Sequence, residues 1–196
     1  MNVYDFDNTI YRGESGVDLF KFFLKRDPSL LKGIPWGAKL LAEYKLAKLP
    51  LQEIIDKHSP RVEAYGQKLG DLQALTVEFW NQYSYKIKPF YIAHHQEDDV
   101  IISACLDFVL EEVCRRLNVK NYIGSEVDQE TRRLVSFCYR ENKVKAFHEH
   151  YPGQKIDNLY TDSFNDKPLM EIAENVYLVK GNKMTKIKEN GVMLSK

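Results

Sequence analysis

Three kinds of feature are scarce or missing in this sequence, and each absence narrows what the protein can be. There are three cysteines, an odd number without the spacing of metal ligands, which favours reduced thiols over a disulfide framework. No apolar run reaches the roughly 18 residues that a membrane helix needs. The 28 basic and 28 acidic residues cancel, so nothing in the charge suggests a nucleic-acid partner.

The chain also lacks internal repeats and low-complexity stretches. Its first apolar run starts at Val3, which leaves no room for a signal peptide before it. Together with the reduced cysteines, this predicts a cytoplasmic protein. With 44% hydrophobic residues in 196, the chain is long enough for one full core, or for a core with a small insertion.

Short apolar runs alternate with helical patterns along much of the chain. The runs are apolar on both faces, as parallel strands covered by helices are. Apolar residues in 106–117 recur at the spacing of one helical face. This alternation predicts an α/β fold, a three-layer, Rossmann-like core with a parallel sheet. The predicted strands lie at residues 3–4, 100–102, 122–123, 156–160 and 176–179.

Residues 15–88 differ from this pattern, because they contain no clear strand and are predicted to form several helices. Both tryptophans, Trp36 and Trp80, lie here, which predicts a separate apolar interior for the segment. Further on, residues 124–139 combine a polar turn with alternating apolar residues and predict a hairpin-like excursion. The polar tail, 181–196, is compatible with either a flexible end or a final hairpin.

The acidic residues near the N-terminus are the most informative feature of the chain. Asp5 and Asp7 stand two apart at the end of the first predicted strand, so their side chains point to the same face. Two like charges so close need a counter-charge, and a divalent cation is the obvious one. Ser103 and Asp162 also directly follow apolar strand runs. Because ligands bind beyond the carboxyl ends of parallel strands, these residues are expected to converge at one edge of the sheet.

Four short segments follow one another along the chain: residues 5–10 (DFDNTI), 101–104 (IISA), 141–144 (ENKV) and 161–166 (TDSFND). In this order they resemble the motifs of the haloacid dehalogenase superfamily, in the form carried by its phosphatases. The phosphoserine-phosphatase-like branch is the most similar. The family more often has glycine where Thr161 stands, a departure that affects the loop rather than the carboxylates.

The resemblance also implies a division of the chain. This superfamily places a small helical cap between its first and second motifs. Residues 15–88 would accordingly form an all-α cap domain, and residues 1–14 plus 89–196 the α/β phosphatase core.

The resemblance implies a Mg²⁺-dependent phosphatase that hydrolyses a small phosphorylated metabolite through an aspartyl-phosphate intermediate. Asp5 is the expected nucleophile, since an ionised carboxylate can form a mixed anhydride with phosphate. Asp7 would protonate the leaving alcohol and then activate water. Asp162 would complete the Mg²⁺ site with the Asp5 carboxylate and the Asp7 backbone carbonyl, because magnesium prefers hard oxygen ligands.

Phosphate binding is expected from the second and third motifs. Ser103 would donate its hydroxyl to a phosphate oxygen, with help from the N–H of Ala104 at the start of the following helix. A helix N-cap is the alternative role for Ser103. Lys143 would neutralise the phosphate and the crowded carboxylates. Lys145 competes with it for this role.

Three further residues complete the expected site. Thr9 would bond the Asp5 carboxylate or brace the turn. Asp166 would hold a metal-bound water or orient the lysine. Glu14, by similarity to phosphoserine phosphatases, would reach a substrate amine. Its alternative role is that of an exposed acid favoured near a helix start.

Other functions remain open on the same residues. A phosphotransferase would use the same site with an alcohol in place of water. A catalytically silent binding protein on this scaffold is disfavoured by the complete set of acids. Dehalogenation is disfavoured as well, because that chemistry needs only the first aspartate and no metal. No protein partner is predicted.

Overall fold

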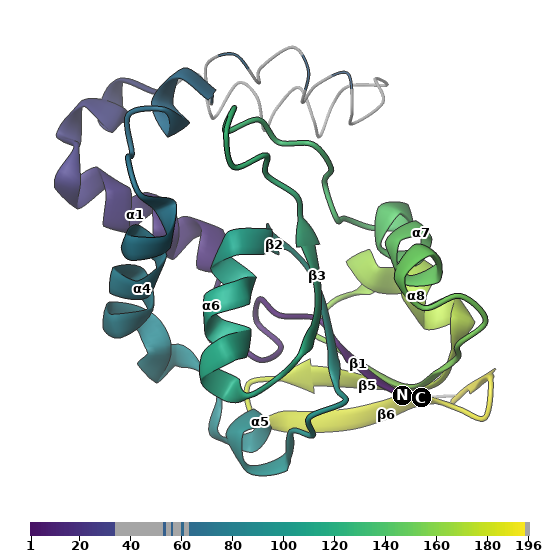
Figure 1. The fold of residues 1–196 in the computed structure, drawn as a ribbon. Coiled ribbons are helices and arrows are strands. Elements are labelled where there is room, and N and C mark those ends of the chain that lie inside the picture. Colours follow the sequence, from purple (N-terminus) through teal and green to yellow (C-terminus); the bar gives the residue numbers. More distant parts are fainter. Residues whose placement is uncertain (34–52, 54–55, 57–59, 61–62, 195–196) are drawn as a thin grey trace.

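A seven-stranded sheet forms the centre of the computed structural model, which describes residues 1–33, 53, 56, 60 and 63–194 (Figure 1). The strand order is β3-β2-β1-β4-β5-β6-β7. The first five strands in this order are parallel to their neighbours, and β6 and β7 are antiparallel. The strands are β1 (Asn2–Tyr4), β2 (Val100–Leu106), β3 (Asn121–Ser125), β4 (Ile156–Thr161), β5 (Ala173–Lys180), β6 (Lys183–Glu189) and β7 (Val192–Met193).

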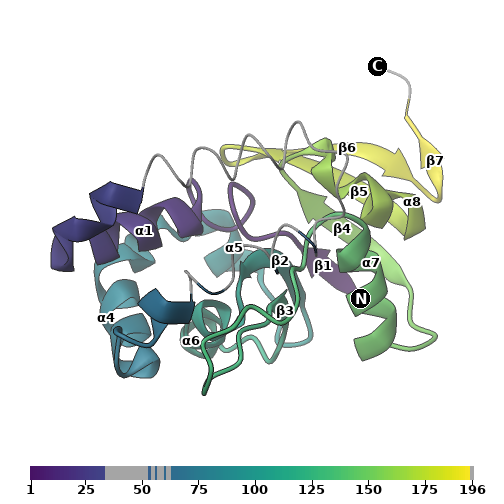
Figure 2. The same cartoon turned by 90° about the horizontal axis from the view of Figure 1, so that it is seen from above.

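Helices cover both faces of the sheet. Figures 1 and 2 show α1, α4 and α6 on one side and α7 and α8 on the other. The arrangement confirms the predicted three-layer α/β fold. The helices that lie wholly within the described residues include α1 (Ser15–Arg26), α4 (Leu72–Tyr83), α5 (Pro89–His94), α6 (Asp107–Leu117), α7 (Glu141–His150) and α8 (Lys167–Ile172), with 3₁₀ turns at Pro28–Gly33, Ser84–Lys86 and Phe164–Asp166.

The apolar interior consists of two clusters, one on each face of the sheet. On the first face, α1, α4, α5 and α6 pack around Phe6 and Ile101. On the second, α7 and α8 pack around Val3 and Ile102. Each of the five predicted strand runs lies within an observed strand. Parallel strands with apolar side chains on both faces need helices on both sides, which is what the structure provides.

The central position of β1 places the first acidic motif in the middle of the sheet. Val3 pairs with Val100 on one side and with Leu159 on the other. Tyr4 stacks on Tyr160 of β4 with ring centroids 4.4 Å apart. The carboxyl ends of β1, β2 and β4, at Tyr4, Leu106 and Thr161, are therefore neighbours although they are far apart in sequence.

Trp80 corrects one expectation about residues 15–88. Its indole Nε1 donates a hydrogen bond to the Val109 carbonyl of α6 at 2.8 Å, and its ring packs edge-on against Phe6 and Tyr11. Trp80 belongs to the apolar cluster on the first face of the sheet. The prediction that residues 15–88 have a separate apolar interior is therefore wrong for Trp80. The reason is that α4 buries its apolar side against α6. Trp36 lies outside the described residues, and the division into core and cap stays a prediction.

The structure shows how residues 124–139 and the C-terminal tail fold. Within residues 124–139, Val127 and Leu134 form an antiparallel bridge, as expected of a hairpin-like segment. The tail forms hairpins rather than a flexible end, because β6 pairs antiparallel with β5. Gly181 makes the connecting turn at φ +61°, a conformation that glycine adopts without strain.

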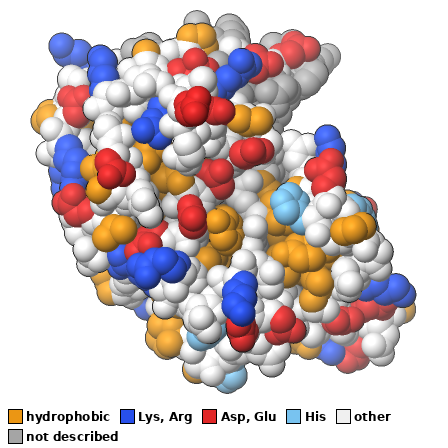
Figure 3. Space-filling view, viewed as in Figure 1, with side chains coloured by type: hydrophobic (Ala, Val, Ile, Leu, Met, Phe, Trp, Pro, Cys, Tyr) orange, Lys and Arg blue, Asp and Glu red, His pale blue; other side chains and the backbone are white. Residues whose placement is uncertain are grey.

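The surface mixes charges of both signs. Figure 3 shows acidic and basic side chains interspersed over the face seen in Figure 1. No helix within the described residues combines the length and the apolar character required to cross a membrane.

Candidate active site

A cavity of about 150 Å³ lies where β1, β2 and β4 end. It collects residues from all four sequence motifs, as expected from the parallel sheet. Of the predicted site residues, only Thr9 is absent from its wall, and Thr9 bonds to Asp5 from behind. The lining residues are Asp5, Asp7, Glu14, Ser103, Ala104, Tyr139, Lys143, Asp162, Ser163, Asn165 and Asp166.

Asp5 is held from both sides of its carboxylate. Its backbone N–H donates to the Tyr160 carbonyl at 2.9 Å, which continues the strand pairing into the site. Oδ1 accepts a hydrogen bond from Lys143 Nζ at 2.7 Å, and Oδ2 accepts one from Thr9 Oγ1 at 3.3 Å. Burial raises the pKa of Asp5, and the Lys143 ammonium opposes this effect by favouring the charged carboxylate. The geometry thus selects the bonding role expected for Thr9.

Lys143 lies between two carboxylates. Its Nζ is 2.7 Å from Asp5 Oδ1 and 2.7 Å from Asp166 Oδ1. Burial disfavours its charged form, but the two carboxylates outweigh burial and raise the pKa of Lys143 above its ordinary value. Thr161 Oγ1 in turn donates to Asp166 Oδ2 at 2.8 Å. Asp166 therefore orients the lysine, one of the two roles expected for it.

The competing lysine lies elsewhere. The side chain of Lys145 is 75% exposed and pairs only loosely with Glu149, at 3.8 Å on the same helix, whereas that of Lys143 is 3% exposed. The two residues are separated by two positions on α7, a rotation of about 200° on a helix with 3.6 residues per turn. The helix therefore directs only one of them into the cavity.

Asp7 connects the first motif to α1. Its Oδ1 accepts a hydrogen bond from the backbone N–H of Ser15, the first residue of α1, at 2.7 Å. Burial raises the pKa of Asp7 to about 6, although the hydrogen bonds from Ser15 lower it. A carboxyl group with this pKa is present in both protonation states near neutral pH, which suits a group that gives and takes a proton.

Two hydrogen bonds hold the turn after Asp7, and neither was predicted from the sequence. Asn8 has a left-handed φ of 58°, and its Nδ2 donates to Glu14 Oε1 at 2.5 Å. Lys88, which is almost fully buried, donates from Nζ to the Asn8 carbonyl. Nothing local in the sequence singles out Lys88, because it is 80 residues away from Asn8. Glu14 lines the cavity while it braces this turn.

The position of Ser103 corrects another expectation. Strand β2 continues to Leu106, which pairs with Ser125 after a register shift, and α6 begins only at Asp107. Ser103 Oγ accepts a hydrogen bond from the Cys105 N–H at 3.0 Å. Ser103 is therefore not a helix N-cap. The idea that the Ala104 N–H lies at a helix start is wrong, because the irregular end of the strand separates Ala104 from the helix.

The oxygen atoms around the cavity fit a magnesium ion. Asp5, Asp7 and Asp162 all line it, so carboxyl oxygens, which are the ligands that magnesium prefers, face the cavity from the first and fourth motifs. Among the described residues, no three Asp, Glu, His or Cys side chains group closely enough to hold a metal by themselves. Magnesium does not require such a group, because it keeps several waters and binds through one or two carboxylates. Burial raises the pKa of Asp162, and the nearby Lys180 lowers it.

Three lining residues were not predicted. Ser163 and Asn165 belong to the fourth motif, between its two aspartates, and reach the cavity through the tight 3₁₀ turn there. Tyr139 lies just before α7 and also faces the cavity. Tyr139 stands next to other apolar and aromatic residues, Phe137 and Cys138, and carries no distinguishing sequence signal, so only the path of the chain reveals this position.

Fold and site together define an α/β protein with an acidic centre at the carboxyl edge of a mostly parallel sheet. Residues 3–171 match the family model described as haloacid dehalogenase-like hydrolase, and the chain belongs to that family. The match includes the first motif and the last one, so it contains every residue of the candidate site. A search of curated proteins gives no match.

Solved structures share the fold at low sequence identity. A protein with unknown function from Bordetella pertussis Tohama I superposes with a TM-score of 0.67 at 18% identity, covering 87% of this chain and 85% of that chain. A phosphoserine phosphohydrolase-like protein from Francisella tularensis subsp. tularensis SCHU S4 gives 0.58 at 17% identity, covering 90% and 86%. A HAD family hydrolase from Salmonella enterica serovar Typhi gives 0.55 at 15%, covering 87% and 59%.

Proposed function

We propose that this protein is a Mg²⁺-dependent phosphatase that hydrolyses a small phosphorylated metabolite through an aspartyl-phosphate intermediate. The observation that carries the proposal is the buried pairing of Asp5 with Lys143, at 2.7 Å, in a cavity shared with Asp7 and Asp162. Membership of a hydrolase family supports it. Three buried free cysteines support the cytoplasmic location expected from the sequence.

In the first step an Asp5 oxygen attacks phosphorus, and the bond from phosphorus to the alcohol oxygen breaks. Lys143 offsets the negative charge of the phosphoryl group as well as that of Asp5, and Ser103 donates its hydroxyl to a phosphate oxygen. Such electrostatic contacts are a large part of catalysis in phosphoryl transfer. Asp7 gives its proton to the leaving alcohol.

In the second step water attacks the aspartyl-phosphate and Asp7 takes the proton from that water. Inorganic phosphate leaves, and the Asp5 carboxylate and protonated Asp7 are restored. The hydrogen bond from Ser15 holds Asp7 at 2.7 Å from the start of α1, which keeps the proton carrier in place between the two steps. Residues 15–88 would form the cap above this site.

The carboxylates of Asp5 and Asp162 and the backbone carbonyl of Asp7 would hold Mg²⁺. When bound, this ion neutralises charge on the phosphate oxygens. Asp166 remains with Lys143, so the ion would take its carboxylate ligands from Asp5 and Asp162. Glu14 already accepts a hydrogen bond from Asn8, and its expected contact with a substrate amine stays a prediction.

Substitution of Asp5 by asparagine tests the nucleophile. Lys143 keeps its ion pair with Asp166 in this variant, so we expect the circular dichroism spectrum to be unchanged while turnover of a generic phosphate ester is lost. After rapid acid quench, wild-type protein should carry phosphate label from the substrate and the variant should not. Full activity of Asp5→Asn would falsify the assignment.

A phosphotransferase would form the same intermediate, so product analysis must separate the two functions. Added alcohols should leave free phosphate as the main product if water is the natural acceptor. A phosphorylated alcohol as the main product would identify a transferase. Absence of both label and turnover in the wild-type protein would identify a silent binding protein.

A further inference from the structure

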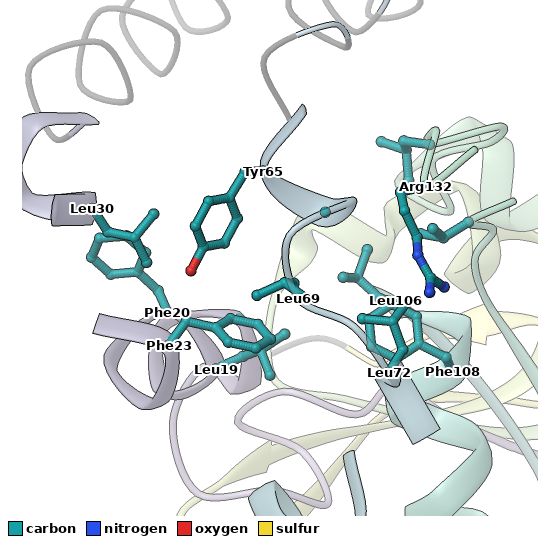
Figure 4. Close-up of a pocket in the computed structure, with 14 residues that line it drawn as sticks. Leu19, Phe20, Phe23, Leu30, Tyr65, Leu69, Leu72, Leu106, Phe108 and Arg132 are labelled. Atoms are coloured by element: carbon teal, nitrogen blue, oxygen red, sulfur yellow. The ribbon is translucent and has the colours of Figure 1, made fainter. Parts of the chain in front are cut away.

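A second, larger cavity of about 310 Å³ lies beside the candidate active site. Figure 4 shows Leu19, Phe20 and Phe23 of α1 on one side of it, and Leu106, Phe108 and Arg132 on the other. Its size falls within the range of small-molecule sites. The lining residues are Gly16, Leu19, Phe20, Phe23, Leu30, Tyr65, Gly66, Leu69, Leu72, Leu106, Phe108, Val127, Arg132 and Leu134.

This cavity is almost entirely apolar. Among the described residues that line it there is no carboxylate. The Arg132 guanidinium is already engaged, since it donates to the Gly70 carbonyl at 2.9 Å and to Gln129 Oε1 at 3.3 Å. Tyr65 provides the one hydroxyl of the lining. A charged or strongly polar group would lose its hydration here with little in return.

Two elements connect the apolar cavity to the catalytic one. At the start of α1, Glu14 just before the helix lines the catalytic cavity, and Gly16 within it lines the apolar cavity. On β2, Ala104 lines the first and Leu106 the second. Two residues of extended chain span about 7 Å. A phosphate ester bound at Asp5 therefore has an apolar space within reach of its alcohol portion.

The aromatic residues of α1 divide between the core and this cavity. Phe22 is fully buried among core side chains, whereas Phe20 lies on the cavity wall with much of its ring exposed. An exposed aromatic ring beside a concave apolar surface lowers solubility and does not stabilise the core. The position of Phe20 is explained if the cavity binds an apolar group of a ligand.

We propose that this cavity binds the alcohol portion of the substrate, and that the enzyme selects phosphate monoesters of apolar alcohols over those of polar alcohols. The inference rests on the proposed phosphatase function, since it extends the same site. Selection would come from burial of hydrocarbon, in place of hydrogen bonds to a polar leaving group.

A series of straight-chain alkyl phosphates measures this selection. Each methylene that enters an apolar site contributes about 0.8 kcal/mol, or about fourfold in kcat/KM. With three or more methylenes buried, octyl phosphate should exceed ethyl phosphate by at least about 50-fold. Phosphoserine and glycerol phosphate should resemble ethyl phosphate. Uncleavable alkylphosphonates of the same lengths, titrated calorimetrically, should show a parallel gain in affinity.

A substitution at Gly16 tests whether the gain arises in this cavity. A Cβ at Gly16 meets no atom within 4 Å, so Gly16→Leu adds a side chain at the cavity wall without a backbone clash. We expect it to reduce the ratio of octyl to ethyl kcat/KM by at least about tenfold, since it occupies the space of several methylenes. Val17→Leu is the matched control, because Val17 is exposed and does not line the cavity; its ratio should equal that of the wild type.

The outcomes separate the two proposals. Turnover of ethyl phosphate with no gain for longer chains would overturn the apolar cavity and leave the phosphatase intact. Longer phosphonates that bind more tightly, without turnover of any ester, would support the cavity and refute the phosphatase. Equal ratios in Gly16→Leu and Val17→Leu would place the chain-length effect outside this cavity and overturn the inference.

Discussion

Replacing Lys143 by methionine should affect both stability and activity strongly, whereas the same change at Lys145 should affect neither. In the native protein, Lys143 Nζ is 2.7 Å from both Asp5 and Asp166, and its side chain is 3% exposed. Methionine has a similar length but no charge. The variant therefore leaves two buried carboxylates facing each other without their shared cation.

The magnitude follows from the cost of an unpaired buried charge. Removing one partner of a buried ion pair typically costs about 3 to 5 kcal/mol. The Lys145–Glu149 pair is exposed and 3.8 Å apart, and such pairs contribute at most about 0.5 kcal/mol. We therefore expect the unfolding free energy of Lys143→Met to fall by at least about 3 kcal/mol relative to Lys145→Met.

Urea denaturation at pH 8, followed by circular dichroism in the presence of EDTA, measures this difference without a contribution from bound metal. Turnover should fall by about 100-fold or more in Lys143→Met, because a charged contact to the reacting groups is lost. Equal stability and equal turnover of the two variants would refute the reasoning. A destabilised variant that keeps full turnover would mean that the lysine only supports the fold.

Three other perturbations test separate parts of the structure. Arg115 and Arg116 lower the pKa of Glu112 to about 2. The stability that the ionised Glu112 gives the folded protein is therefore fully present above its ordinary pKa of about 4.5, and it is lost as pH falls towards 2. Because Arg115 is largely exposed, solvent screens part of this interaction. We expect Glu112→Gln to lower the unfolding free energy, measured by urea denaturation, by about 2 kcal/mol at pH 7 and by almost nothing at pH 2. Trp80→Ala should lower the unfolding free energy by about 3 to 5 kcal/mol. Tyr85 is exposed, so Tyr85→Ala should change it by no more than about 0.5 kcal/mol. Similar losses in the two variants would contradict the packing of Trp80 in the core. EDTA should abolish turnover and Mg²⁺ should restore it, and a chelator-insensitive enzyme would contradict the proposed ligand role of Asp162.

The fold was predictable because its signals are local. Apolar runs such as 100–102 and 176–179 can be buried on both faces only as inner strands of a covered sheet. The helical spacing in 106–117 requires a helix with one buried face. A strand of parallel sheet points its carboxyl end at the ligand side, so the order of the motifs was enough to bring Asp5 and Asp162 to one cavity.

The contacts that complete the site were not predictable, because they depend on packing between distant segments. The third motif favoured Lys143 over Lys145, but only the orientation of α7 shows that Lys143 meets Asp5 and Asp166 together. Lys88 reaches Asn8 across 80 residues. The register shift in β2 moves Ser103 away from the helix start, which no local preference indicates.

Periodicity thus sufficed for the layers, and the resemblance of the first and fourth motifs to those of the family pointed to their acids, since both signals lie within a few neighbouring positions. The burial of each side chain, the ion pairs of the carboxylates and the apolar cavity beside α1 depend on how the helices pack against the sheet. This packing depends on the whole interior, because side chains from several segments together determine the position of each helix. Tertiary structure alone therefore decides that Lys143 lies between Asp5 and Asp166, and that Trp80 is buried against α6.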